Sequence, residues 1–163
     1  MGDVFQVFAQ THWGLSSRKY ASLLALYGGM GILSNIFGSR LVKVWGVKRL
    51  TGVAIISSII SSAATAFGGF RGSIIGLVIG FLGPSQSIGI IASLVNKVTS
   101  TGMPAGKLAG ERAALIALLK ILAPIWYSFL YLQGQKTFAT GTLPFIFDIA
   151  LRLVALGLSQ SCL

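Results

Sequence analysis

Six apolar stretches, separated by short gaps that hold most of the charge, constrain the fold of this chain more than any other feature. A helix needs about 20 apolar residues to cross a bilayer, so five stretches are long enough and the first is too short. The expected helices cover about 1–12, 20–38, 50–69, 73–98, 111–131 and 142–159. We predict an all-α integral membrane bundle of five full transmembrane helices plus a short N-terminal apolar helix, forming one domain over 1–163.

Composition indicates that lipid is the solvent of this surface. Charged residues make up only 10% of the chain and hydrophobic residues 54%, whereas water-soluble domains carry about 25% charged residues. We expect a multi-pass protein of a cell or organelle membrane, with the lipid bilayer as a partner. The net charge of +10 would otherwise suggest nucleic acid. Because the cations are scattered through the gaps instead of forming a run, no nucleic-acid binding is expected.

The charges in the gaps predict an orientation. The gaps after the second and fourth stretches lie on one side and, counted with the adjoining ends of the stretches, hold seven cations together, whereas the other three gaps hold four. The seven are Arg40, Lys43, Lys48, Arg49, Lys97, Lys107 and Arg112. Basic loops are retained in the cytosol, so we expect the seven-cation side to face the cytosol or its organellar equivalent.

Small residues and prolines inside the stretches predict packing and bends. The G-x-x-x-G pair within 73–98 is interpreted as helix packing and not as a dimerisation site, and the Gly-Pro step after it predicts a kink. The kink and packing positions are Gly76, Gly80, Gly83, Pro84 and Pro124. The serines of 57–62 are expected to bond back to the preceding turn of their own helix, so they need not line a pore.

Three ionisable side chains fall within apolar stretches, namely Lys120, Asp148 and Arg152. Such groups are costly in lipid and usually face the bundle interior or water. Asp148 and Arg152 are four residues apart on one helix, so they share a face and can pair. Asp148 could carry a proton in a coupled transporter. Alternatively, Asp148 and Arg152 form a structural pair, and Lys120 binds a carbonyl or extends to the interface.

The residue patterns of enzymes are missing from the sequence. It contains no Cys/His cluster for a metal, no nucleophile with a nearby base and no phosphate loop in the required strand context. We therefore expect neither enzymatic activity nor a cofactor or metal.

Two stretches resemble parts of the major facilitator superfamily. The loop 41–49 resembles its cytoplasmic loop motif, although Lys43 stands where an acidic residue is common and Val44 where arginine is usual. The motif positions are Leu41, Lys43, Gly46, Lys48 and Arg49. The stretch 106–131 is similar to the loop and eleventh helix of tetracycline-resistance-like members, and Leu143-Pro144-Phe145 to the start of their last helix.

The resemblance covers essentially the whole chain and maps it to the end of helix seven and to helices eight to twelve. It implies membrane transport of a small solute by the C-terminal half of a secondary transporter. The site would lie against a partner, either a missing N-terminal half or a second copy. The alternative is a non-transporting accessory subunit that packs on other membrane subunits of a large photosynthetic or respiratory complex.

Overall fold

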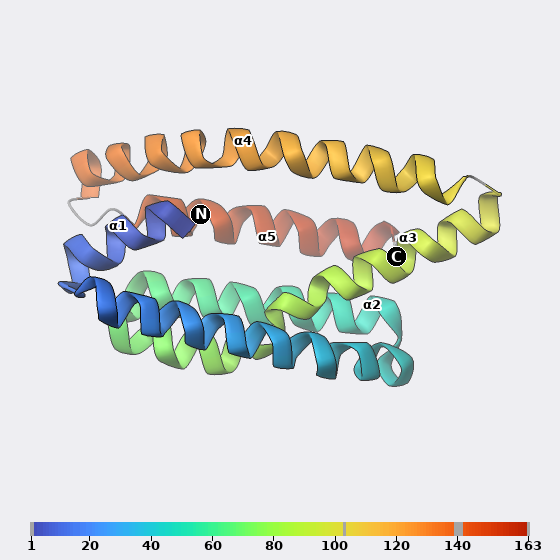
Figure 1. Ribbon diagram of the computed structural model, residues 1–163, viewed down its shortest axis with the longest axis horizontal. Helices are drawn as coiled ribbons and strands as arrows, with labels where there is room; N and C mark the ends of the chain where they lie inside the picture. The colour runs from blue at the N-terminus through green and yellow to red at the C-terminus, as the bar shows by residue number, and fades with distance from the viewer. Residues whose placement is uncertain (1, 103, 139–141, 163) are drawn as a thin grey trace.

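The computed structural model describes residues 2–102, 104–138 and 142–162, which are helical except for short connections and contain no strand. The all-α class expected from the sequence is thus confirmed. The elements are α1 (Gly2–Trp13), α2 (Ser17–Ile79), the 3₁₀ helix η1 (Gly80–Ser85), α3 (Gln86–Thr101), α4 (Ala105–Phe138) and α5 (Leu143–Cys162) (Figure 1).

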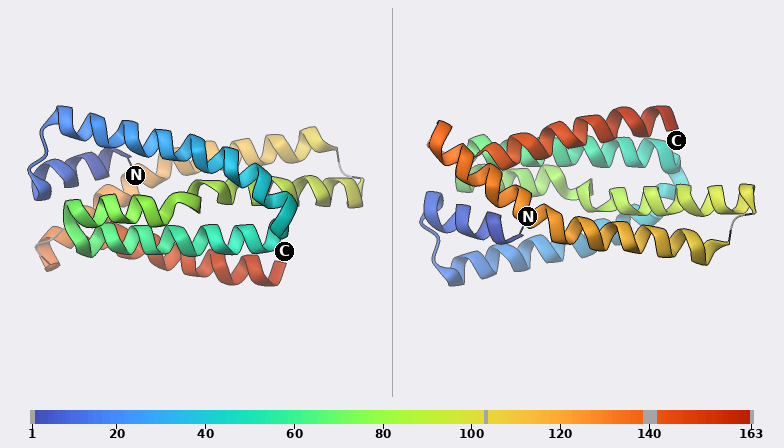
Figure 2. Two further views of the ribbon diagram at one scale, coloured as in Figure 1. Left: turned by 90° about the horizontal axis from the view of Figure 1, so that it is seen from below. Right: turned by 90° about the horizontal axis from the view of Figure 1, so that it is seen from above.

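Helix α2 is broken at two glycines and consists of three runs. Gly46 has φ 79° and ψ 163°, and Gly69 has φ 59° and ψ −152°. A side chain rarely adopts these angles, so glycine permits the reversal of the chain at both points. The resulting runs, 17–45, 47–68 and 70–79, lie side by side (Figures 1 and 2). The expected stretch 20–38 lies within the first run, and 50–69 nearly coincides with the second.

The third run continues through η1 into α3, so the expected stretch 73–98 is interrupted where the sequence carries Gly83-Pro84. Proline has no N–H and clashes one turn back, which disfavours a continuous α-helix here.

The Ser57 hydroxyl donates to the Ile79 carbonyl at 2.8 Å, from the neighbouring run. The expectation that the serines of 57–62 bond back within their own helix is therefore wrong for Ser57, because a carbonyl beside the interruption accepts its proton instead.

The second run of α2 meets the third run and η1 along a seam of small residues. A Cβ added at Gly76 would lie 2.9 Å from the Ser61 carbonyl oxygen, and one added at Gly80 would lie 2.5 Å from the Ser61 Cβ. Gly83 approaches Ser58 in the same way. The G-x-x-x-G pair thus serves packing within this chain, where two backbones approach closely.

Helix α5 packs along α2, whereas α4 covers α5 and α1 with little burial (Figure 1). Most α4 side chains are exposed, and their apolar members include Leu115, Leu119, Leu122, Trp126 and Phe129. Within the part of the chain that the structure describes, three helical stretches are long and apolar enough to cross a membrane: Ser17–Ser100, Gly106–Lys136 and Leu143–Gln160.

The connections gather at two ends of the bundle. The reversal between the first two runs of α2, the junction of α3 with α4 and the end of α5 lie toward one end, here called the basic end (Figures 1 and 2). The α1–α2 connection, the second reversal of α2 and the beginning of α5 lie toward the other. This arrangement places the two gaps that together account for seven cations at the same end.

Candidate functional site

A cavity of about 420 Å³ lies between α1, α2, η1 and α5. Phe5, Phe81 and Phe145 contribute apolar surface to it, and Asp148 and Arg152 contribute charge. Its hydroxyl groups come from Tyr27, Ser58, Ser61, Ser62 and Thr65. An apolar cavity of this size with a few converging polar groups is the usual form of a small-molecule site.

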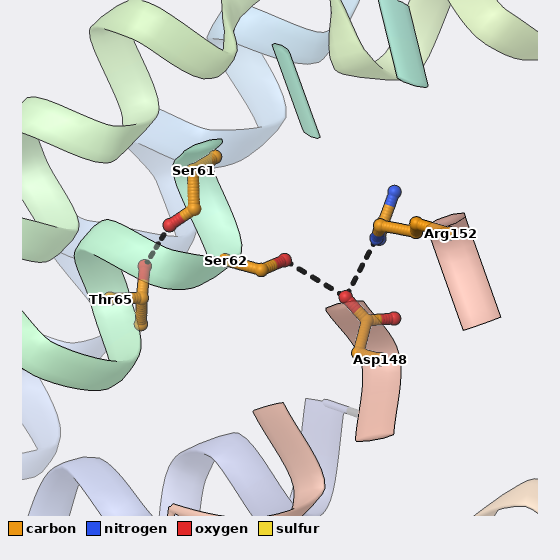
Figure 3. Close-up of polar contacts among 5 residues, drawn as sticks. All are labelled: Ser61, Ser62, Thr65, Asp148 and Arg152. Atoms are coloured by element: carbon orange, nitrogen blue, oxygen red, sulfur yellow. Dashed lines mark hydrogen bonds and ion pairs between the residues drawn. The ribbon is translucent and has the colours of Figure 1, made fainter. Parts of the chain in front are cut away.

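Asp148 is the centre of the polar contacts in this cavity (Figure 3). Its Oδ2 accepts a hydrogen bond from Arg152 Nε at 2.7 Å and another from Ser62 Oγ at 2.8 Å. Asp148 is buried, with 8% of its surface exposed. A carboxylate removed from water requires charged or hydrogen-bonding partners, and these two contacts supply both.

Two helices bring this group together. Asp148 and Arg152 are separated by four residues on α5, which places them on one face. Ser62 comes from the second run of α2, 86 positions earlier in the chain. The Ser62–Asp148 hydrogen bond therefore ties α5 to α2 at the wall of the cavity. The expected back-bonding of the serines is wrong for Ser62 as well, since a carboxylate within reach is a stronger acceptor than a backbone carbonyl.

The other hydroxyls hold neighbouring parts of the wall. Thr65 Oγ1 donates to the Ser61 carbonyl at 2.9 Å, within the second run of α2. The Tyr27 hydroxyl lies 2.9 Å from Ser73 Oγ and joins the first run to the third. With the hydrogen bond from Ser57 to the Ile79 carbonyl, which joins the second run to the third, all three runs of α2 are connected by short polar contacts.

An aromatic cluster closes the cavity on the side of α1. The Phe5 ring meets Phe145 at a centroid distance of 6.3 Å and Tyr27 at 6.1 Å, both edge to face. Phe8 meets Phe145 at 5.0 Å. These edge-to-face contacts favour a fixed arrangement of the rings and attach the short α1 to the rest of the bundle.

Lys120 stands apart from the other two intramembrane charges. It lies on the exposed surface of α4 and does not line the cavity. The structure therefore brings together two of the three residues that the sequence singled out. Of the kink and packing positions, Gly80, Gly83 and Pro84 line the cavity. Gly76 lies in the seam, and Pro124 lies within α4.

The loop-motif residues surround the first reversal of α2. Gly46 provides the positive φ of the turn, and Leu41 and Lys43 lie in the run before it. Lys48 Nζ donates to the Gln160 carbonyl at 2.7 Å, which ties the turn to the last residues of α5. Lys48 and Arg49 also line a second groove at this end.

Sequence reasoning missed the hydroxyl-bearing wall of the cavity. Ser58, Ser61, Ser62 and Thr65 follow the spacing i, i+3, i+4, i+7, which places all four on one helical face. A polar stripe on one face of an apolar helix was the available signal. Tyr27 had no comparable signal, because its role depends on the fold of α2.

Among the residues that the structure describes, no three His, Cys, Asp or Glu side chains lie close enough to hold a metal ion together. Comparisons of the chain with protein families, with curated proteins and with solved structures find no match.

Proposed function

We propose that this chain is a multi-pass membrane protein that moves a small solute, as the C-terminal half of a transporter of the major facilitator type. Its cavity wall would be completed by a partner, either an N-terminal half or a second copy. The observation that carries the proposal is the charged pair Asp148 and Arg152 in the wall of a largely apolar cavity, between helices whose outer surfaces are apolar.

The helical runs support five full spans preceded by a shorter helix. The apolar stretch Ser17–Ser100 has 84 residues, so as one straight helix it would be about 126 Å long against a hydrocarbon core of about 30 Å. The reversals at Gly46 and Gly69 divide it into three passes. With α4 and α5 these give five spans, and α1 is too short to be a sixth.

The distribution of charge supports an orientation. The two gaps that together account for seven cations both lie at the basic end of the bundle (Figure 1). Basic connections are retained on the cytosolic side during insertion, so the basic end would face the cytosol or its organellar equivalent.

The charged groups in the cavity wall support a transport site over a passive packing defect. Burial of a carboxylate and a guanidinium in a membrane interior is costly, and such groups usually mark a solute or ion pathway. Ser62 and Arg152 both bond to Oδ2 of Asp148. Oδ1 makes no hydrogen bond within the described part of the chain and can receive a proton or a donor group of the solute. The aromatic rings nearby offer contact to an apolar portion of the solute.

The cavity and the chain's exposed faces support the need for a partner. The described residues do not fully enclose the cavity, and solute sites of these transporters lie between two halves. One half alone leaves such a site without its second wall. Movement of solute would then follow from rocking of the two halves against each other around the site.

The exposed helix α4 favours a second candidate, a structural accessory subunit of a large membrane complex. Leu118, Ile121, Ile125 and Leu132 are all more than half exposed on α4. Such a helix can contact lipid, but it can equally pack on other membrane subunits. In this case the Ser62–Asp148 hydrogen bond would only hold α5 to α2, and Arg152 would only balance the charge of the carboxylate.

Cysteine accessibility distinguishes transport from a static role. The chain has one cysteine, Cys162, so Cys162→Ser gives a background without thiols. In it, Met30→Cys places a thiol on the cavity wall, and Leu153→Cys places one on the exposed apolar side of α5. The protein, with its membrane companions, is reconstituted in sealed vesicles. A membrane-impermeant thiosulfonate reagent is then added from either side.

We expect the Met30→Cys thiol to react from both sides, because an alternating cavity opens to each in turn. The Leu153→Cys control should react from neither, because lipid excludes the reagent and the thiolate. Reaction of Met30→Cys from one side only, or from neither, contradicts transport. Stoichiometric co-migration of the chain with a large complex in mild detergent would then identify the accessory subunit.

A further inference from the structure

A second groove, of about 620 Å³, lies at the basic end between the start of the second α2 run and the end of α5. It is separate from the Asp148 cavity, with which it shares no lining residue. Its walls are formed by Trp45, Lys48, Arg49, Val53, Ile56 and Gln160, together with a glycine at position 52. Neither Asp nor Glu lines it, so the groove carries two uncompensated positive charges.

The two cations differ in their local contacts. Lys48 Nζ is fixed by its 2.7 Å hydrogen bond to the Gln160 carbonyl near the end of α5. Arg49 is exposed and makes no hydrogen bond or ion pair within the described part of the chain. Its guanidinium is therefore available to an anion and can bind phosphate oxygens through two parallel N–H donors.

Apolar side chains continue the groove along the helix, away from the cations. Val53 is 40% exposed and Ile56 47% exposed, and their spacing of three residues places them on one face of the run. Trp45 lies at the charged end, where an indole is favoured at the boundary between headgroups and hydrocarbon. The groove is thus positive at one end and apolar along its length.

We propose that this groove binds an anionic phospholipid, with the phosphate on Arg49 and Lys48 and an acyl chain along Val53 and Ile56. The inference requires the membrane embedding proposed above, but it does not depend on transport. Basic pockets beside membrane helices hold anionic headgroups by charge. The apolar wall distinguishes a lipid from a free phosphate, because only a lipid has a chain to place there.

Native mass spectrometry of the delipidated, detergent-purified protein tests the proposal. Phosphatidylglycerol and phosphatidylcholine with the same acyl chains are titrated into the wild type, Arg49→Gln and Arg40→Gln. Arg40 is an exposed cation toward the same end that does not line the groove. We expect the wild type to prefer phosphatidylglycerol, and Arg49→Gln to bind it about fivefold more weakly, the effect of one surface cation. Arg40→Gln should remain within twofold of the wild type, and Arg49→Lys should retain most of the affinity.

Competition with glycerol 3-phosphate separates a lipid from a simple anion. We expect no displacement of phosphatidylglycerol at equal concentration, because the competitor has no acyl chain. Displacement would overturn the lipid assignment in favour of a phosphate site. Equal binding of the two lipids by the wild type would overturn the proposal, and this outcome does not depend on the folding of any variant. Equal losses of affinity in folded Arg49→Gln and Arg40→Gln would overturn it as well.

Discussion

Ser62 and Asp148 lie 86 positions apart in the chain and are joined by a 2.8 Å hydrogen bond from the serine hydroxyl to the carboxylate. This contact links α2 to α5 at the wall of the cavity. Hydrogen bonds to charged groups contribute more than neutral ones when both partners are withdrawn from water. The stability of the α2–α5 contact should therefore depend measurably on one hydroxyl.

Ser62→Ala should lower the free energy of unfolding by about 1.5 kcal/mol, because it removes one of two donors to a buried carboxylate. Denaturation with dodecyl sulfate in mixed micelles, followed by circular dichroism, gives the value. Ser39→Ala is the matched control. Ser39 bonds only to a carbonyl of its own exposed turn at 2.7 Å, so its loss should stay within about 0.5 kcal/mol. Equal effects of the two substitutions would contradict this account of Asp148.

Arg152→Met should lower the free energy of unfolding by about 2 kcal/mol, because the carboxylate of Asp148 would remain buried without its cation. Adding Asp148→Asn to Arg152→Met removes that unpaired charge. The loss in the double variant should therefore be smaller than the sum of the single losses by about 1 kcal/mol. The same micelle denaturation, performed on all four proteins of the cycle, measures the coupling. Additive losses would mean that the 2.7 Å contact contributes nothing to stability.

Gly76→Ala should lower the free energy of unfolding by about 2 kcal/mol, since its methyl group would force two backbones apart. The added Cβ would stand 2.9 Å from the Ser61 carbonyl oxygen, which cannot rotate away. Gly29→Ala serves as the control, because a Cβ there meets nothing within 4 Å. In that helix alanine should be neutral or stabilising by about 0.5–1 kcal/mol. Thermal unfolding in detergent compares the two variants, and the opposite order would exclude close packing at the seam.

Gly46→Asn should destabilise the protein by about 1–3 kcal/mol, as much as Gly46→Ala should. Its φ of 79° with ψ of 163° belongs to a region that is restricted to glycine. Gly102 has φ 64° and ψ 14°, a left-handed conformation that asparagine tolerates. Gly102→Asn should therefore be mild. No atom lies within 4 Å of a Cβ at either glycine, so steric contact cannot explain a difference between them. Thermal unfolding of the three variants therefore tests whether backbone conformation determines the loss of stability.

Much of this architecture could be predicted from the sequence, because apolar length and the position of charges follow local rules. The stretch 50–69 and the interruption at Gly83-Pro84 needed no tertiary information. Helix ends were less accurate: α4 covers Ala105–Phe138, whereas the apolar stretch suggested 111–131. Polar residues continue a helix when backbone hydrogen bonds are available, so hydropathy alone underestimates its length.

The site could be predicted only in part. The separation of Asp148 and Arg152 by four residues indicated a pair on one helix. The partner on α2 could not be predicted, because the choice between an own-helix carbonyl and a distant carboxylate depends on how α5 packs. Lys120 was grouped with this pair by hydropathy, yet α4 places it on the exposed surface. Position along the chain measures depth in a membrane, but it does not indicate the direction in which a side chain points.

The three runs of α2 have a consequence for biogenesis. The third run packs beside the second, which is made just before it, so these contacts are local in sequence and close quickly. The first run meets the third through Tyr27 and Ser73, 46 positions apart. All of these contacts lie within residues 17–101, so this part can assemble while the ribosome still holds α4 and α5. Helix α5 is made after α2 and meets a surface on which Ser62 is already in place. Synthesis thus delivers the acidic side chain of Asp148 to a prepared partner, which limits the time that it spends unpaired.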